Sequence, residues 1–285
     1  VKARLAVRHE DRGDWQYSQT RNDTLGRRNF TTGRLLLDAQ PSDKLTLQFN
    51  LNGWIDKSDS QAAQFIAYAP TNPVGFPEEK AFFATAVRAP NKARVADWDP
   101  GVDFRHDDRL YQASVRADLE LSPNISLTSI TAYTDFRGRN PNDSDGVAFN
   151  DLFFFIKSDI DSFSQELRLS GGTSGLKWMI GGNYQHDTAN EDQLGHEWAS
   201  NSGVATPAFV SRYRDFVIRN NQKIKTSAVF ASVDYEIAPA FKIQGSVRYT
   251  DQRRNASGCL LDAGDGALAT AFGNLYSLLQ TIGSG

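Results

Sequence analysis

Few residues in this chain have the types and spacing that catalysis requires. His196-Glu197 begins like a zinc-protease motif, but Ser200 stands where the second histidine belongs. The other histidines are dispersed, and no glycine-rich phosphate loop is present. We therefore expect no enzyme activity, no resident metal and no cofactor.

Acidic side chains gather in one stretch of the chain. Carboxylates are the ligands that calcium prefers, but this stretch lacks the ordered spacing and the glycine of a known cation loop. We interpret it as a solvated loop, with a calcium site as the alternative. The side chains concerned are Asp97, Asp99, Asp103, Asp107 and Asp108.

The segment 58–106 has the best residues for capturing a ligand. It is irregular and rich in proline, and a loop this long in a compact domain is usually functional. Aromatic surface combined with positive charge would suit an anionic metal chelate. The candidates for ligand contact are Tyr68, Arg88 and Trp98, and the same segment carries Phe76, Phe82, Phe83, Lys92 and Arg94.

The elements that must hold this segment are strands with one apolar and one polar face. In 241–249, Phe241, Ile243 and Val247 alternate with polar residues, as expected where successive side chains point to opposite faces. The same pattern predicts about nine strands: 2–11, 30–40, 44–57, 107–122, 125–138, 158–170, 176–190, 222–238 and 241–254.

The connections between these strands alternate between short turns and long polar loops. In an up-and-down barrel, all short turns then lie on one rim and all long loops on the other, as in transmembrane barrels. Tyrosines near the loop ends fit an aromatic band at a membrane interface: Tyr111, Tyr133, Tyr184 and Tyr249. The fold predicted is therefore all-β, an antiparallel up-and-down transmembrane β-barrel. A soluble antiparallel sandwich has the same alternation and remains the alternative.

Composition agrees with this fold and excludes other classes. The chain has 285 residues, 40% hydrophobic and 23% charged, with a mean hydropathy of -0.48. Barrels have polar interiors and loops, so a low hydropathy does not exclude them. No apolar run has the length of a spanning helix, and a net charge of -3 does not indicate a nucleic-acid partner.

Several segments in a fixed order resemble the barrel of TonB-dependent outer-membrane receptors. Residues 163–170, Phe-Ser-Gln-Glu-Leu-Arg-Leu-Ser, are similar to a recurrent strand of that family. A glycine turn and the strand 176–184 follow, as in the family, and 129–133 resembles the strand before. The segments 227–235 and 245–250 look like the next hairpin, so the resemblance covers most of residues 1–255.

The resemblance implies a function and a partial structure. Family barrels have roughly 22 strands, so residues 1–285 would be part of a barrel domain, a fragment in which the plug domain and its energy-coupling motif have no counterpart. The family takes up scarce nutrients, most often ferric siderophores, across the bacterial outer membrane with energy from the TonB system. The implied partners are outer-membrane lipid, the TonB complex acting through the plug, and a small-molecule ligand such as a metal chelate. A passive porin-like channel and a soluble all-β binding module are the alternatives.

Two smaller features leave alternatives open. The tail 259–282 has apolar residues at helical spacing, and its lone Cys259 either belongs to a cysteine pair of the kind found in family loops or is an incidental cysteine.

Charged residues on the polar faces have two interpretations. They either hold a plug or guide a solute, or they form a cross-strand ladder of ion pairs, and we favour the ladder. They are Arg4, Arg8, Arg116, Arg168, Arg248, Asp38, Asp118, Glu120, Glu166 and Asp234.

Overall fold

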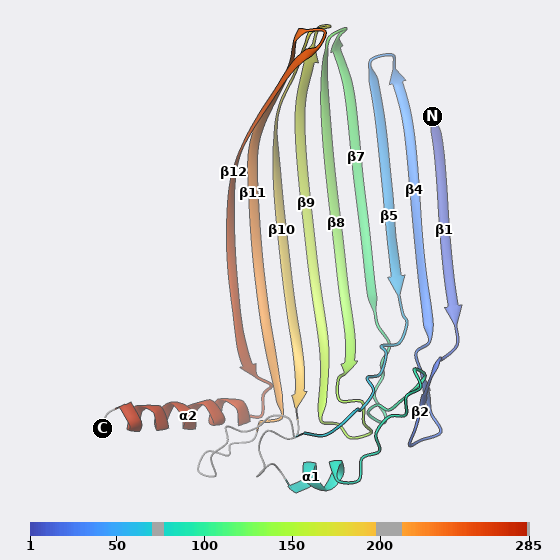
Figure 1. Cartoon of the computed structure of the whole chain (residues 1–285), viewed down its shortest axis with the longest axis vertical. Helices are drawn as coiled ribbons and strands as arrows, with labels where there is room; N and C mark the ends of the chain where they lie inside the picture. The colour runs from blue at the N-terminus through green and yellow to red at the C-terminus, as the bar shows by residue number, and fades with distance from the viewer. Residues whose placement is uncertain (70–76, 198–212, 284–285) are drawn as a thin grey trace.

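The computed structural model describes residues 1–69, 77–197 and 213–283. Within these residues, nine long strands form one antiparallel sheet and follow one another in it in sequence order (Figure 1). Three short strands form a separate small sheet. The strands of the sheet are β1 (Lys2–Arg12), β4 (Arg28–Ser42), β5 (Leu45–Asp56), β7 (Asp108–Ser122), β8 (Ile125–Asp143), β9 (Leu152–Gly172), β10 (Leu176–Glu197), β11 (Asp215–Ala238) and β12 (Phe241–Asp262).

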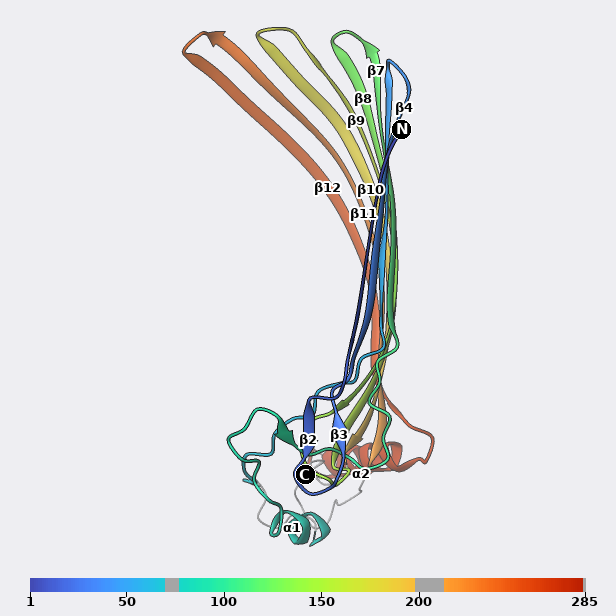
Figure 2. The same ribbon diagram turned by 90° about the vertical axis from the view of Figure 1, so that its right-hand side faces the viewer.

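The sheet is an open, curved wall with β1 and β12 at its two edges. Short turns join the strands at one end and the long connections lie at the other (Figure 1). Seen edge-on, the wall bends toward its turn ends, as a segment of a barrel must (Figure 2). The fold predicted from the sequence is therefore confirmed as part of an up-and-down transmembrane barrel.

Irregular pairing marks three of the turns. The register shifts between Ala39 and Ser42, between Glu120 and Ser122, and between Glu236 and Ala238. The first shift contains Pro41, which has no N–H to donate to a ladder and is tolerated at a bulge. Such bulges increase local twist where each hairpin closes.

The two faces of the wall differ as the alternation predicts. A typical row on one face runs through Leu5, Leu35, Leu51 and Ala113 on adjacent strands. The adjacent row on the other face contains Asn52, whose side-chain amide donates to Gln112 at 3.0 Å, and Gln112 donates in turn to Thr134 at 3.2 Å. We name these the outer face and the inner face. On the outer face the apolar side chains are exposed, because lipid is their partner.

The strands on the C-terminal side are longer than predicted. Residues 139–157 were predicted as a loop, but β8 continues to Asp143 and β9 begins at Leu152, so the apolar run 152–156 is strand. β10 and β11 likewise extend through much of the predicted loop 191–221. In these extensions both faces are polar, as in 139–143, or both are apolar, as in 152–156, and the alternation by which strands are recognised is lost. Since a spanning strand needs only about 9–11 residues, the extensions lie beyond the bilayer.

The charged groups of the inner face do not form the cross-strand ladder that the sequence favoured. Arg116 pairs with Asp118 at 2.7 Å, and Arg168 pairs with Glu166, in both cases two residues along the same strand. Residues i and i+2 share a face, so the alternation allows a pair within one strand as well as a pair across two strands. The predicted ladder is therefore wrong for these pairs.

The tail contains the predicted helix. α2 (Ala267–Gly283) follows β12, and the Asp262 carboxylate accepts N–H bonds from residues 264, 266, 268 and 269, which satisfies donors at the start of the helix. Cys259 is exposed and unpaired in the described part of the chain. Neither α2 nor the short α1 (Pro77–Phe83), the helices of the described ranges, is long and apolar enough to cross a membrane.

Candidate ligand-binding site

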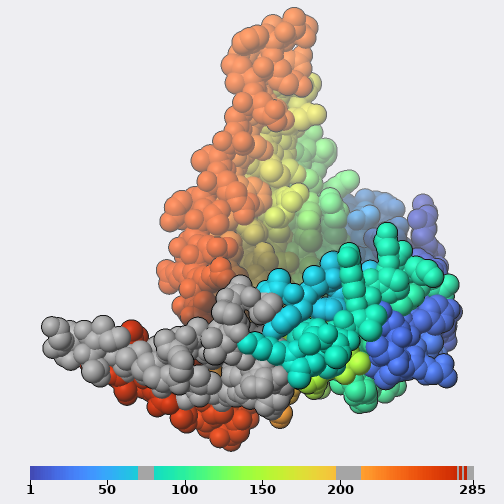
Figure 3. Space-filling view, turned by 60° about the horizontal axis from the view of Figure 1, so that its bottom comes forward, coloured from blue at the N-terminus to red at the C-terminus, as the bar shows by residue number. Residues whose placement is uncertain are grey.

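Segments distant in sequence fold together beyond the loop ends of the strands. β2 (Gln16–Ser18) pairs antiparallel with β3 (Thr24–Leu25) and parallel with β6 (Val95–Ala96), which joins residues nearly 80 positions apart. We name the described residues 13–27, 57–69, 77–107 and 144–151 the loop layer. From the loop end, its N-terminal part (blue) and its later part (teal) form one continuous surface (Figure 3).

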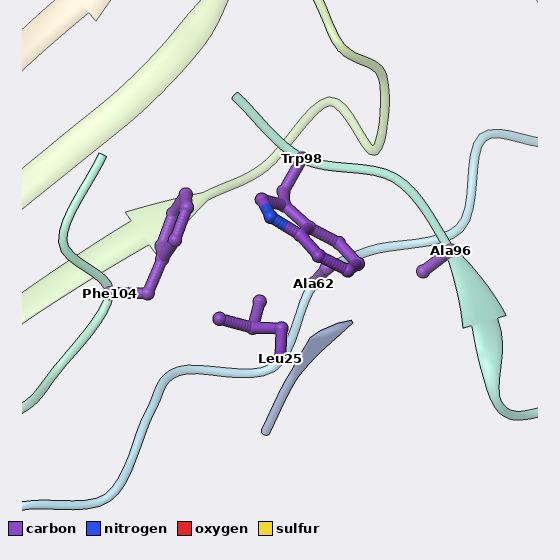
Figure 4. Close-up of a cluster of buried hydrophobic side chains, with 5 residues drawn as sticks. All are labelled: Leu25, Ala62, Ala96, Trp98 and Phe104. Carbon is purple, nitrogen blue, oxygen red and sulfur yellow. The ribbon is translucent and has the colours of Figure 1, made fainter. Parts of the chain in front are cut away.

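The loop layer has a small hydrophobic core of its own. Trp98 is only 3% exposed, and its indole points toward Leu25 and Ala62 (Figure 4). Ala96 and Phe104 complete this cluster. The segment 58–106, which the sequence analysis described as an irregular loop, is therefore held in a defined structure by burial.

Polar contacts bind the same core together. The buried Gln16 side chain donates to the carbonyl of Ala62 at 3.0 Å and accepts from its N–H at 2.9 Å. Arg21 pairs with the buried Asp97 at 3.1 Å, and its guanidinium lies 5.6 Å from the centre of the Trp98 ring. Buried polar groups that are paired in this way fix one arrangement of the segments.

Tyr68, Arg88 and Trp98, the predicted ligand contacts, lie in different environments. The Tyr68 ring stacks on Phe83 with 4.5 Å between centroids and 1° between planes, and Arg88 is exposed. Trp98 lies in the core, where it supports the loop layer. Ligand contact by these three residues stays a prediction.

Aromatic rings gather around α1. Phe83 also lies 5.6 Å from Phe65, and Phe82 stacks on Phe149 at 4.6 Å, which connects α1 to the loop between β8 and β9. Predicted aromatics of this segment are thus brought together, with Phe149 added from a distant loop. Phe76 lies outside the described residues.

The acidic stretch is not the solvated loop that the sequence favoured. Asp97 and Asp99 are each 1% exposed and Asp108 is 8% exposed, whereas Asp103 lies at the surface. Burial is the main cause that raises the pKa of Asp99 to about 7, and the nearby Asp143 carboxylate adds to it. Burial also raises the pKa of Asp145. Asp99 is buried because it packs against the turn that begins at Asp143, and its backbone N–H donates to the Asp143 carboxylate at 2.8 Å.

The inner face becomes apolar at its loop end. The cross-strand row Trp54, Leu110, Phe136 and Ile160 on β5, β7, β8 and β9 lies between two polar rows, one with Asn52 and Gln112 and one with Asp56 and Asp108. The Trp54 ring lies 5.9 Å from Phe136 and 6.0 Å from Phe30. We name Phe30, Trp54, Leu110, Phe136 and Ile160 the wall patch.

A cation borders the wall patch. The Arg28 guanidinium lies 4.6 Å from the centre of the Phe30 ring, and it also pairs with Asp56 at 2.9 Å. All five side chains of the patch are at least partly exposed on the inner face. Aromatic faces beside a guanidinium can bind a ligand with flat rings and negative charge.

The wall patch was missed from the sequence, although a signal existed. Trp54 lies two residues after Asn52, and Phe136 lies two residues after Thr134. Both therefore point to the inner face, where the alternation requires polar residues. An apolar side chain on the polar face is a departure from the pattern that secondary structure does not explain. Searching for such departures would have found the patch.

The described residues contain no group of three His, Cys, Asp or Glu side chains that could hold a metal ion. His196 Nδ1 lies 2.6 Å from a carboxylate oxygen of Asp215, so the histidine of the incomplete protease motif has a structural partner. Ser200 of that motif lies outside the described residues.

Residues 46–278 match the family described as TonB dependent receptor-like, beta-barrel. This is most of the chain, and the protein belongs to that family. The resemblance seen in the sequence is thereby confirmed. Members of this family are transport receptors and not enzymes.

Solved structures share the fold. The ferric yersiniabactin uptake receptor FyuA from Yersinia pestis is similar with a TM-score of 0.59 and 13% identity, over 90% of this chain and 38% of that one. The ferric-catecholate import receptor Fiu from E. coli K12, in its open form, has a TM-score of 0.54 and 11% identity, over 90% of this chain and 41% of that one. The ferric citrate transporter FecA has a TM-score of 0.53 and 12% identity, over 90% of this chain and 33% of that one.

The chain thus spans between a third and about two fifths of these structures. At this identity the likeness shows the fold. No curated protein sequence matches the chain.

Proposed function

We propose that this chain is part of the barrel wall of an outer-membrane receptor that imports a metal chelate, such as a ferric siderophore, with energy from the TonB system. Residues 1–285 then form part of the barrel domain, and the plug through which the TonB complex acts lies outside them. The work of the protein is binding and gated passage, with no bond chemistry.

One observation carries this proposal beyond family membership. The wall patch lies on the inner face at the loop end of the strands, where a solute entering from the loop side first meets the wall. An inner face that only lined a water-filled lumen would stay polar here, because side chains in contact with water gain nothing from being apolar. Aromatic rings at this level, with Arg28 beside them, favour capture of a flat, anionic ligand.

The loop layer supports the same function. Its folded core holds α1 and the exposed Arg88 in place, so a ligand meets a preorganised surface and less binding energy is lost in ordering the segment. The proposed ligand contacts therefore combine the rings around α1 with the wall patch.

Uptake by the full-length receptor tests the proposal. Cells that produce the receptor and lack other routes for iron would be supplied with radiolabelled ferric chelates, with and without a functional TonB system. We expect uptake of at least one chelate that stops without TonB. Equal uptake in both backgrounds would indicate the passive porin-like channel instead.

Variants of the wall patch locate the site. Trp54→Ala with Phe136→Ala should weaken chelate binding by about tenfold or more, because two stacking surfaces are lost. Leu51→Ala with Leu127→Ala is the matched control, since these residues lie on the outer face of the same two strands, β5 and β8. Equal binding by both double variants would exclude the wall patch as a ligand site.

A further inference from the structure

Carboxyl groups from two distant segments meet where the turn after β8 packs on the segment that follows β6. Asp97 and Asp99 belong to the second segment, and Asp143, Asp145 and Asp151 come from the end of β8 and the connection to β9. Asp145 is partly buried and the others are buried. We name residues 97–99 and 143–151 the acidic contact. Burying this much like charge is unfavourable, so protons or cations are needed to keep the contact closed.

Arg21 supplies little of that compensation. In the part of the chain that the structure describes, Arg21 favours ionisation of Asp99, whereas Asp143 and Asp151 oppose it. Arg21 is already engaged by Asp97 at 3.1 Å, and Asp97 also accepts a hydrogen bond from Ser18 at 2.9 Å. Asp97 is therefore satisfied, and the other carboxyl groups of the acidic contact are left largely uncompensated.

The Asp99 carboxyl is the least satisfied group of the contact. Neither of its oxygens has a hydrogen-bond partner among the described residues, although its backbone N–H donates to the Asp143 carboxylate. A buried carboxylate without donors is much less stable than a neutral carboxylic acid. Burial therefore raises the pKa of Asp99 to about 7, and in acid this side chain carries a proton.

A second proton belongs to Asp143 and Asp145, whose carboxyl groups lie within hydrogen-bonding reach of each other. Burial, followed by the charge of Asp143, raises the pKa of Asp145 to about 8, and the charge of Asp99 adds to this effect. Two carboxyl groups this close share one proton more easily than they carry two charges. Deprotonation would thus introduce repulsion at two places in the acidic contact.

The turn of the acidic contact also holds the rings around α1. Phe149 stacks on Phe82 of α1 at 4.6 Å. Gly146 has a φ of 71°, and a Cβ there would lie 2.8 Å from the backbone N of Phe65, so the turn packs closely on that segment. Phe65 in turn lies 5.6 Å from Phe83. A movement of the turn would disturb both aromatic contacts of α1.

We propose that the acidic contact is a proton-operated clamp, which holds the rings around α1 in place when its carboxyl groups are protonated and opens when they are charged. This inference rests on the proposed function, since the rings around α1 are among the proposed ligand contacts. It adds regulation to that site: a chelate meets a preorganised ring surface in acid and a loosened one in alkali.

The direction of the effect follows from the raised pKa values. A carboxyl group whose pKa is higher in the closed form than in the open form stabilises the closed form fully below its ordinary value near 3.8. This stabilisation is lost as the pH rises through about 7 for Asp99 and about 8 for Asp145. Between these limits, each such group lowers the ratio of closed to open form by about tenfold per pH unit.

Distances between two spin labels in the full-length receptor test the clamp. The labels are attached through Ala81→Cys on α1 and Asn150→Cys in the turn, which are exposed positions, in a receptor that carries Cys259→Ser. Double electron–electron resonance is recorded at pH 5 and at pH 9 with EDTA present. We expect one short distance at pH 5 and mainly longer distances at pH 9, with the ratio of closed to open form lower by about a hundredfold or more. The same distribution at both pH values would overturn the proposal.

Variants identify the groups responsible. Asp99→Asn keeps the shape of the side chain without its charge, so more of the closed form should remain at pH 9. Asp107→Asn is the matched control, because Asp107 is exposed in the same connection between β6 and β7 and its variant should titrate as the original receptor does. Equal titrations for Asp99→Asn and the control would overturn the proposal. Asp145→Asn should shift the distances in the same direction, which provides the test if Asp99→Asn fails to assemble.

A divalent cation would neutralise the same carboxyl groups, and calcium separates this case from protonation. Calcium chloride is added at pH 9 in place of EDTA. Distances that stay long support a clamp operated by protons. Full return of the short distance would overturn the proposal in favour of a cation site.

Binding of ferric citrate and of a ferric tricatecholate connects the clamp to the ligand site. The original receptor and Asp99→Asn are compared at pH 9, where each probe has the same chemistry for both proteins. A probe that binds should bind Asp99→Asn about tenfold more tightly, and equal affinities would overturn the regulation of the site. The distances are measured without a chelate, so a receptor that shows the clamp but imports nothing contradicts only the proposed function. A receptor that imports a chelate with distances independent of pH contradicts only the clamp.

Discussion

The wall and the loop layer of this protein are stabilised in different ways. In the wall, each strand pairs with its sequence neighbours, and the apolar side chains point outward to lipid. In the loop layer, segments distant in sequence meet around the indole of Trp98, and the apolar side chains point inward. The wall therefore depends on its surroundings for its hydrophobic stabilisation, whereas the loop layer has a core of the kind found in soluble proteins.

The largest expected effect comes from placing charge on the outer face of the wall. Val233→Arg in the full-length receptor should reduce assembly, because arginine on the lipid face costs up to about 2–4 kcal/mol, with the largest cost at the bilayer midplane. Its neighbour on the inner face provides the control, Ser232→Arg, which should assemble. Heat-modifiable migration on gels measures folded barrel, and similar amounts for the two variants would contradict the assignment of faces.

The next effect should be confined to the loop layer. Trp98→Ala removes the largest side chain of its core and should cost about 3–5 kcal/mol of local stability. The wall should assemble normally, while loop segments become sensitive to added protease. Val87→Ala is the control, since Val87 is 61% exposed. Loss of the assembled barrel in the Trp98 variant would mean that the two regions do not fold independently.

A smaller effect should depend on pH. The pKa of Asp99 is raised to about 7 in the folded loop layer, from an ordinary value near 3.8. A raised carboxyl pKa gives stability that is fully present below the ordinary value and is lost as the pH rises through about 7. Protection factors from hydrogen exchange in the loop layer, which correct for the faster intrinsic exchange at high pH, should therefore be larger at pH 5 than at pH 8.

Asp99→Asn separates this effect from general changes with pH. The amide has no charge to bury, so the variant should lose part of the difference in protection between pH 5 and pH 8, while Asp145, whose pKa burial also raises, keeps the rest. Asp103→Asn is the control, because Asp103 is exposed. An equal pH response in the original receptor and in Asp99→Asn would show that Asp99 is not the group responsible.

The smallest effect concerns a surface ion pair of the wall. Arg219 and Asp192 lie 2.8 Å apart, but their side chains are 46% and 41% exposed. Arg219→Gln should change the stability of the assembled barrel by less than about 1 kcal/mol. The temperature at which heat-modifiable migration is lost would measure it, and a large drop would mean that charge pairs contribute to the wall as much as lipid contact does.

The two regions also differ in how well a sequence predicts them. The period of two in 241–249 needs only neighbouring residues to be recognised, and the strands of the wall were predicted with their faces. The extensions 139–143 of β8 and 152–157 of β9 lack that period, because both of their faces are polar or both apolar, and they were placed in loops. Pairing between Tyr17 and Val95 has no local signal at all.

The candidate site shows the same division. Tyr68 and Arg88 were chosen for their residue types, and those types say nothing of what lies beside them. Burial of Trp98 and Asp99 depends on contacts with residues near 20, 60 and 143, which no spacing in the sequence reveals. Trp54 and Phe136 were detectable, since they interrupt the polar face of strands whose register was already predicted.

The account depends most on the separation of lipid and water by the wall. Spin labels placed one at a time at residues 241–250 of β12, in the full-length receptor in bilayers with Cys259→Ser, measure collision with lipid-soluble oxygen and with a water-soluble nickel complex. The account predicts that oxygen contact peaks at 243, 247 and 249 and nickel contact at 242, 244, 246 and 248. Uniform contact with the nickel complex at every position would contradict it.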